Sequence, residues 1–237
     1  MKSLCMVLTL SVLLLVVGCQ SSPEPISLPA PVQPLSSGKN GTVSLPEPRK
    51  DGDVSVEQSM LHRRSTRSYS GESLTLAEVS QLLWAAQGIT SPGGYRTAPS
   101  AGALYPLELY IVVGDVEGLE SGIYKYEPAG HELNLLVGSD FRSKLASAAL
   151  SQSSVATGAM SIVFTAVYDR TTVKYGDRGI RYVHIEVGHA AQNLCLQAVA
   201  LDLGAVTVGA FSDDSVAKLL DLPDDETPLY IIPMGRK

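Results

Sequence analysis

Hydrophobic residues recur at helical spacing just after residue 75. Four of them share one face of a helix: Leu76, Val79, Leu82 and Leu83. The segment opens with Thr75-Leu76-Ala77-Glu78, a capping-box pattern in which the Thr and Glu side chains bond free backbone N–H groups at a helix start. Gly88 suits the residue that follows a helix end. The pattern predicts a helix from about residue 75 to Gly88.

The chain after about residue 50 alternates between strand-like and helix-like segments. Apolar runs predict buried strands at 107–113, 122–126, 161–168 and 229–234. Helical patterns occupy 141–150, 178–203 and 213–220. Residues of the 178–203 helix are apolar or small on most faces, so we expect it to be largely buried, with Gly204 closing it. Strands mixed with helices predict an α+β domain over 51–237.

The N-terminal residues carry a different signal. Lys2 is followed by an apolar run over 8–17 and then by Val16-Val17-Gly18-Cys19. This is a secretory signal, too short to span a bilayer stably. Its end resembles a bacterial lipobox, in which the cysteine is lipidated and becomes the first residue of the mature chain. We expect a lipoprotein signal peptide over 1–18; a plain signal peptide with a chance Cys19 is the alternative.

The segment 19–50 is predicted to be a tether. Residues 20–50 carry seven of the fourteen prolines, with Ser and Gly between them. Such a composition favours an extended, disordered linker, which would lift a domain off a membrane. The net charge of −6 argues against nucleic-acid binding, and against a basic patch as the membrane anchor. Acylated Cys19 would hold the protein in the bacterial cell envelope, with the domain facing the periplasm or the exterior.

Cysteine and histidine offer little chemistry. Once Cys5 and Cys19 are assigned to the signal, only Cys195 remains, and one thiol cannot form an internal disulfide. Cys195 lies in a helical stretch, which favours a buried structural role over a nucleophile. His184 and His189 are five residues apart, off the spacing of one helix face, and we expect no metal site.

Three other segments carry candidate chemistry. Arg63-Arg64-Ser65-Thr66-Arg67 places three guanidinium groups and two hydroxyls within five residues. On one helical turn Arg63 and Arg67 would project from the same face, and guanidinium forks suit phosphate oxygens. A solvated basic surface is the alternative interpretation.

The other two segments are rich in small residues. In 99–106 small residues between Pro99 and Pro106 would let the backbone approach something flat and large, or simply form a tight turn. In 174–179 Lys174 and Tyr175 stand side by side next to glycines and could give and take protons, or simply belong to a loop before a helix.

Together these motifs resemble the nitroreductase superfamily, and in detail its SagB-type dehydrogenases. The resemblance covers roughly residues 52–237. The segments that carry it occur in the order typical of that family: 63–69, Leu82-Leu83-Trp84-Ala85-Ala86-Gln87-Gly88, 99–106, Lys174-Tyr175-Gly176, Gly188-His189-Ala190-Ala191-Gln192-Asn193 and Gly209-Ala210-Phe211.

The resemblance implies a mostly antiparallel central sheet wrapped by helices and an intertwined homodimer with FMN at each interface. It implies a first FMN-binding segment at Arg63, Arg64, Ser65 and Arg67, and a segment that reaches in from the other subunit at Pro99, Ser100 and Ala101. It also implies a backbone stretch beside the flavin ring at Val208, Gly209 and Ala210, and a basic residue near the phosphate at Arg236.

Lys174 and Tyr175 match a Lys-Tyr pair of the azoline oxidases in this branch, where the pair assists proton removal while hydride leaves to FMN. The resemblance therefore implies an FMN-dependent oxidoreductase acting on a small molecule or a peptide. A protein of another class, a non-catalytic envelope lipoprotein that keeps the fold and loses the flavin contacts, is the alternative.

Overall fold

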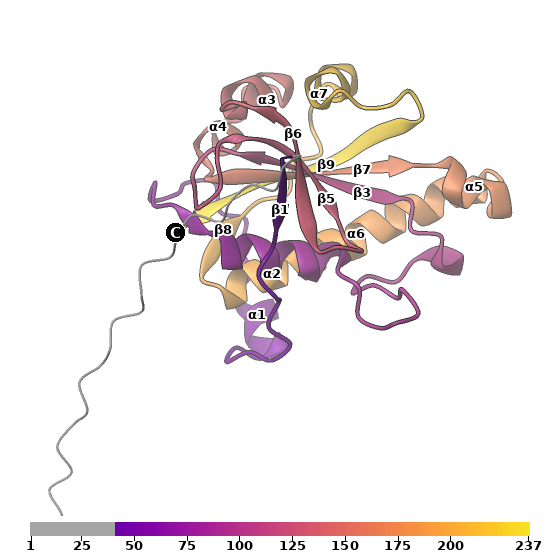
Figure 1. Ribbon diagram of the computed structural model, residues 1–237, viewed down its shortest axis with the longest axis horizontal. Coiled ribbons are helices and arrows are strands. Elements are labelled where there is room, and N and C mark those ends of the chain that lie inside the picture. Colours follow the sequence, from indigo (N-terminus) through magenta and orange to yellow (C-terminus); the bar gives the residue numbers. More distant parts are fainter. Residues whose placement is uncertain (1–40) are drawn as a thin grey trace, which may run out of the picture. The chain divides into compact units, whose positions relative to one another are not determined.

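The computed structural model describes residues 41–237, which build a seven-stranded sheet covered by helices (Figure 1). The strand order is β1-β6-β5-β3-β7-β9-β8, and each neighbouring pair is antiparallel. The strands of this sheet are β1 (Thr42–Ser44), β3 (Leu107–Val113), β5 (Gly122–Glu127), β6 (Glu132–Gly138), β7 (Met160–Val167), β8 (Leu203–Ala205) and β9 (Glu226–Arg236). A small parallel pair joins β2 (Leu74–Thr75) to β4 (Val116–Glu117). The expected α+β fold with a mostly antiparallel sheet is confirmed.

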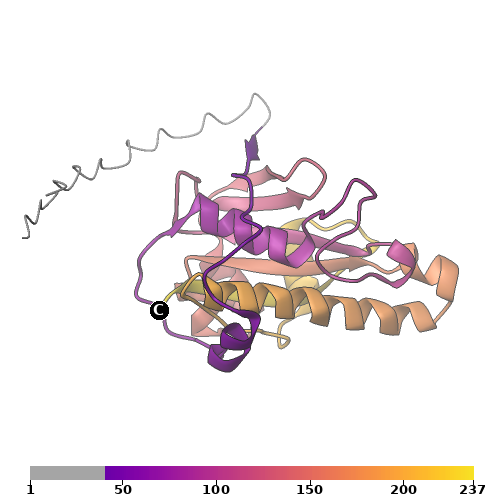
Figure 2. The same ribbon diagram turned by 90° about the horizontal axis from the view of Figure 1, so that it is seen from below.

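Helices cover both faces of the sheet (Figures 1 and 2). Helices α2 (Leu76–Gln87) and α6 (Arg178–Ala200) pack together on one face, and α1 (Val56–His62) contacts α6. On the other face lie α3 (Arg142–Ala148), α4 (Ser153–Thr157) and α7 (Asp213–Leu220). Helix α5 (Asp169–Tyr175) links β7 to α6, and a 3-10 turn, η1 (Ala101–Ala103), precedes β3.

The central strand β3 is buried on both faces, which explains its nearly continuous apolar sequence. Leu109 and Ile111 belong to the core cluster under α2 and α6, whereas Tyr110 and Val112 belong to the cluster under α3 and α7. Because helices cover both faces, alternation between apolar and polar residues is lost and every position from Leu109 to Val113 is buried. The strand expected at 107–113 is thereby confirmed.

The predicted capping box is present in α2. The Thr75 side chain accepts from the Glu78 N–H, and Glu78 Oε2 accepts from the Thr75 N–H at 2.8 Å. Gly88 caps the C-terminus, but with φ −64° it is not in the left-handed conformation. A Cβ at Gly88 would lie 2.1 Å from Trp84 Cδ1, so the position requires glycine because of space.

The long helix α6 differs from its prediction in two ways. It ends at Ala200, because Asp202 takes a left-handed φ of 55° and the chain turns into β8. Gly204 lies inside β8 and does not close the helix. The helix is also only partly buried in this chain, since Ile185, Gly188 and His189 are exposed.

The folded unit begins before residue 51. Strand β1 pairs with β6, and Leu45 is buried in the larger core cluster. Residues 42–45 therefore belong to the domain and not to the tether. The signal peptide, Cys19 and most of the predicted tether lie outside the described residues. Within 41–237 no helix combines the length and apolar character needed to cross a bilayer.

Candidate functional site

The arginine-rich segment crosses the edge of the sheet at two glycines. A Cβ at Gly204 would lie 2.6 Å from Thr66 Cγ2, and one at Gly235 would lie 2.9 Å from Tyr69 Cγ. Any side chain at either glycine would push the 65–70 segment off β8 and β9. Gly204 is thus required for this close approach, which the sequence pattern alone did not indicate.

Backbone hydrogen bonds fix the same segment. Thr66 N–H donates to the Ala205 carbonyl at 2.9 Å, and Ser70 N–H donates to the Arg236 carbonyl at 3.0 Å. Tyr69 Oη donates to the Pro233 carbonyl at 3.0 Å, and burial raises the pKa of Tyr69. The segment therefore behaves as an added edge of the sheet rather than as a free loop.

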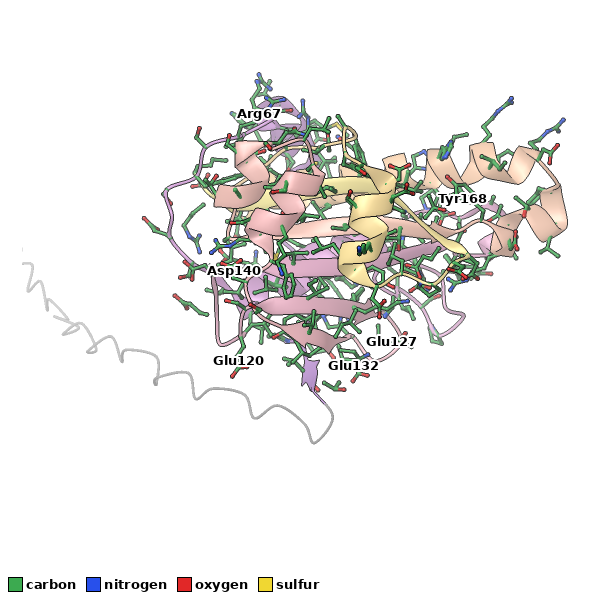
Figure 3. All side chains as sticks on the ribbon, turned by 90° about the horizontal axis from the view of Figure 1, so that it is seen from above. Arg67, Glu120, Glu127, Glu132, Asp140 and Tyr168 are labelled. Atoms are coloured by element: carbon green, nitrogen blue, oxygen red, sulfur yellow. The ribbon has the colours of Figure 1, made fainter. Side chains whose placement is uncertain are left out.

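The arginines of this segment do not share a helical turn, contrary to the sequence expectation. Helix α1 ends at His62, and Arg63 is its C-cap residue. Arg64 Nη1 donates to the Leu61 and Arg63 carbonyls at 3.0 and 2.8 Å, so its guanidinium caps the helix end. Arg67 is exposed and projects from the edge of the molecule (Figure 3).

Arg63 and Ser65 line a small hollow beside the C-terminal part of α6. Its volume is about 20 Å³, which is room for roughly one water molecule. Cys195 also lines it, and burial raises the pKa of that thiol to about 11. The predicted buried, structural cysteine agrees with this environment, because a thiol with such a pKa holds little thiolate at neutral pH.

The predicted ring-contacting stretch lies next to the arginine segment. A parallel bridge joins Ser65 to Ala205, and Val208 exchanges both backbone hydrogen bonds with Ile231. Gly209 and Ala210 follow on the surface and are exposed. The structure thus brings the first predicted flavin segment, 63–67, against Ala205 and the residues that lead into the second, 208–210.

Arg236 is directed elsewhere. Its Nη2 donates to Glu78 Oε2 at 3.0 Å and to the Ser73 carbonyl at 3.4 Å. Glu78 also completes the capping box of α2, so the Arg236 guanidinium stabilises the start of that helix. The guanidinium of Arg236 therefore contacts the start of α2 and the residues just before it, Glu72 and Ser73.

The third predicted segment, 99–105, is a tight turn with unusual backbone angles. Gly102, Ala103 and Tyr105 have φ values of 65°, 54° and 46°. Left-handed backbone is costly for residues other than glycine, so surrounding contacts must hold Ala103 and Tyr105 in place. One such contact is the Tyr105 N–H, which donates to Ser100 Oγ at 2.9 Å.

Lys174 and Tyr175 reach this turn. A Cβ built on Gly102 would lie 2.9 Å from Tyr175 Oη and 3.0 Å from Lys174 Nζ. Two segments that the sequence treated separately, 99–106 and 174–175, therefore form one cluster, in which a glycine leaves room for both side-chain ends.

Helix α5 holds this pair against the turn. Arg170 Nη1 donates to the Tyr105 carbonyl at 3.1 Å, and its other terminal nitrogen pairs with Glu108 on β3. The Tyr175 ring packs edge-on against Tyr182 of α6, with ring centroids 5.1 Å apart. Contacts with β3, with the turn and with α6 thus fix the position of α5.

The two groups of candidate residues lie at different ends of α6. The arginine segment adjoins Cys195 and Ala198, whereas the 99–102 turn adjoins Glu186. Ala198 lies twelve positions after Glu186 in the helix, a distance of about 18 Å along the helix axis. One chain therefore does not unite the two groups in a single site.

The residue types present fit a flavin phosphate and ring. Arg63 and Ser65 supply a guanidinium and a hydroxyl, the donors that a phosphate takes. Gly209 and Ala210 offer exposed backbone with little side chain, and a Cβ at Gly209 would be no closer than 3.7 Å to Tyr230. The hollow at Arg63 is too small for FMN itself, so a flavin would lie over these surfaces and not inside the hollow.

Comparison with known proteins gives the family. The sequence model of a family described as "Nitroreductase family" matches residues 60–236, which is most of the chain. This chain belongs to the nitroreductase family. Members of that family are oxidoreductases, many of them FMN-dependent. The membership expected from the sequence motifs is confirmed.

Individual relatives agree with this assignment. A protein of Methanocaldococcus jannaschii described as a candidate nitroreductase is 46% identical over 185 residues, covering 78% of this chain and 92% of its own. A nitroreductase-type crystal structure from Ralstonia eutropha is 29% identical with a TM-score of 0.71, covering 84% of this chain and 91% of its own.

The similarity extends to a SagB-type protein. The microcin B17-processing protein McbC of Escherichia coli is 27% identical over 155 residues. The match covers 63% of this chain and 57% of McbC. The expected placement in the SagB-type branch is confirmed.

Sequence reasoning missed three residues near the turn: Arg96, Arg170 and Glu186. Arg96 packs over the Tyr105 ring at 4.5 Å, and Glu186 is buried beneath Ser100. One signal was present, because Glu186 falls at helical spacing with the buried Val183 and Ala190. A carboxylate on the apolar face of a helix is unusual enough to draw notice.

Proposed function

We propose that this protein is an FMN-dependent oxidoreductase whose flavin lies between two copies of the chain. The observation that carries the proposal is the convergence of Lys174 Nζ and Tyr175 Oη on Gly102. This cluster lies at the opposite end of α6 from the arginine segment, so a second copy placing its 99–102 turn over the first copy's arginine segment would complete the site.

In this arrangement one copy supplies Arg63, Ser65 and Arg67 to the phosphate and the polar end of the ring, and Gly209 and Ala210 lie beside it. Arg236 supports this region through α2. The other copy supplies Pro99, Ser100 and Ala101. FMN, when bound, accepts or returns hydride, while the protein binds, orients and tunes it.

The Lys174–Tyr175 pair would handle the proton. A C–H or N–H group that loses a hydride also releases a proton, which needs an acceptor near the reacting atom. Tyr175 is half-buried and fixed by Tyr182, whereas Lys174 is exposed, with Nζ 5.4 Å from the Tyr175 ring centroid. The Tyr175 oxygen is therefore the better-positioned group. As a phenolate beside the Lys174 ammonium it would accept the proton and become the neutral phenol.

The substrate class remains a small molecule or a peptide. McbC, by its description, processes microcin B17, a precedent within the SagB-type branch for action on a peptide. The exposed Lys174 and the open turn suit either kind of substrate.

Cys19 is proposed to anchor the protein, with the domain in the cell envelope. NAD(P)H is a cytoplasmic donor, so in that location electrons would come from an organic substrate and pass to a quinone or oxygen. Cys19→Ser should release the processed protein from membranes into the soluble fraction. Sedimentation of the mature variant with membranes would contradict the lipobox assignment.

Absorption spectroscopy tests the cofactor. The full-length protein, purified in detergent, should be yellow with an oxidised-flavin spectrum, and the flavin should leave on denaturation. Sedimentation equilibrium should give twice the chain mass. A colourless protein that takes up no added FMN would favour the alternative, a non-catalytic envelope lipoprotein; the retained Arg63–Arg67 cluster speaks against that alternative.

A further inference from the structure

Glu186 is a buried carboxylate in the N-terminal half of α6 that the proposed chemistry does not use. Its residue is 2% exposed and lies on the packed face of the helix with Val183 and Ala190. Its Oε1 is buried and has no hydrogen-bond partner among the described residues. Burial of an ionisable group is costly, so the contacts of this carboxylate should account for its presence.

The polar groups beside Glu186 belong to the loop above it. The Ser100 side chain and the Ala101 backbone lie near enough to the carboxylate to favour its charged form, and Arg96 is the nearby cation. Burial raises the pKa of Glu186 to about 7, while Ser100, Arg96 and Ala101 act in the opposite direction. Arg96 is shared, because Glu108, Tyr105 and Arg170 face it as well.

Ser100 connects Glu186 to the far end of the turn. Its Oγ accepts from the Tyr105 N–H at 2.9 Å. A serine hydroxyl has a single proton, which is then free to be donated to Glu186. Ser100 thus lies between Tyr105, to which it is bonded, and the buried Glu186 of α6, on either side of the residues with left-handed φ values.

We propose that Glu186 is a positioning residue, which holds the 100–105 turn in its strained conformation and so determines where Gly102 meets Lys174 and Tyr175. Arg170 holds the same turn from α5 through the Tyr105 carbonyl. The catalytic meaning of this arrangement rests on the proposed function, whereas the structural part can be tested without flavin.

Hydrogen–deuterium exchange of the flavin-free, full-length protein tests the structural part. Glu186→Leu keeps the side-chain volume and removes both acceptor oxygens, and exchange in a peptide covering 97–106 should become at least tenfold faster. Glu186→Gln restores one carbonyl acceptor and should give an intermediate rate. Exchange in α2 should not change in either variant.

Glu226→Gln is the matched control. Glu226 is the other buried glutamate of the described chain, and it accepts from Thr165 and Tyr110 within the sheet. Its variant should leave exchange at 97–106 at the wild-type rate. If Glu186→Leu does not fold, the Glu186→Gln comparison decides. Unchanged exchange at 97–106, or an equal rise throughout the domain, would overturn the proposal.

The link to Lys174 needs a second measurement. Lysines methylated with ¹³C give separate NMR signals, and Lys174→Arg identifies the signal of Lys174. Glu186→Leu should shift that signal, whereas Glu226→Gln should shift the signal of Lys125, which pairs with Glu226. Faster exchange at the turn with an unmoved Lys174 signal would overturn the link to the catalytic pair. Absence of FMN binding would contradict only the proposed function.

Discussion

The two ends of α6 carry candidate site residues that are fixed in different ways. At the C-terminal end, the 65–70 segment is held by backbone hydrogen bonds to β8 and β9 and by two glycines that allow close contact. At the N-terminal end, the 100–105 turn is strained and is held by the side chains of Ser100, Glu186 and Arg170. Single side-chain changes should therefore move the second region much more than the first.

The largest effect is expected at the N-terminal end, on the chemistry itself. Lys174→Ala and Tyr175→Phe should retain FMN and slow flavin reduction by the true substrate roughly 10²–10⁴-fold, the usual contribution of a general acid or base. Stopped-flow bleaching of flavin-loaded variants measures this rate. Wild-type bleaching in both variants would leave the pair as structural residues of the turn.

The stability of the protein should depend on pH through Glu186, at the same end of α6. Because the pKa of Glu186 is raised from 4.5 to about 7, the folded protein keeps a proton between these values that the unfolded chain has lost. The free energy of unfolding should therefore fall as pH rises from 4.5 to 7, by a contribution on the order of 3 kcal/mol from this group. Denaturant titrations of the flavin-free protein at pH 5 and pH 8 measure it.

In that experiment Glu186→Gln should remove the contribution, and Glu226→Gln should retain it. The difference between wild type and each variant isolates the group, since other carboxylates titrate in all three proteins. An identical pH dependence in wild type and Glu186→Gln would show that Glu186 does not titrate in this range.

At the C-terminal end, a side-chain change should affect binding without moving the backbone. Arg63→Ala should weaken FMN binding by about 1.5–3 kcal/mol, the range for a hydrogen bond to a charged group. The 65–70 segment should keep its exchange protection, because its backbone bonds are untouched. Fluorescence titration with FMN gives the affinity, and Arg181→Ala, which removes an exposed arginine of α6, serves as control. Unchanged affinity in Arg63→Ala would show that the phosphate lies elsewhere.

The smallest effect separates strain from crowding at Gly102. Gly102 and Gly118 both have left-handed φ values, 65° and 77°, but a Cβ at Gly118 meets nothing within 4 Å. Alanine at either site should cost about 1 kcal/mol of stability through backbone strain. Only Gly102→Ala should also slow turnover, by about tenfold, because it displaces Tyr175 and Lys174. Equal turnover in the two variants would remove crowding as the reason for glycine at 102.

Elements whose signals are local could be predicted from the amino-acid sequence. The period of the apolar residues and the capping box predicted α2, and unbroken apolar runs predicted β3 and β7, because these elements depend on neighbours within a few residues. The order of short motifs likewise identified the family before any contact was known. Local signals did not reveal β1 or β6, because β1 is held by its pairing with β6 and β6 by its pairing with β1 and β5.

The way in which the candidate residues meet could not be predicted from local signals. Gly204 appeared to end a helix, yet it allows Thr66 to lie on β8. Arg63 and Arg67 appeared to share a helical turn, yet the chain leaves α1 at His62. The convergence of Lys174 and Tyr175 on Gly102, and the burial of Glu186 beneath Ser100, depend on segments about 70 to 85 residues apart in the sequence. Such contacts arise from the packing of α5 and α6 against one turn, and no periodicity in the sequence encodes that packing.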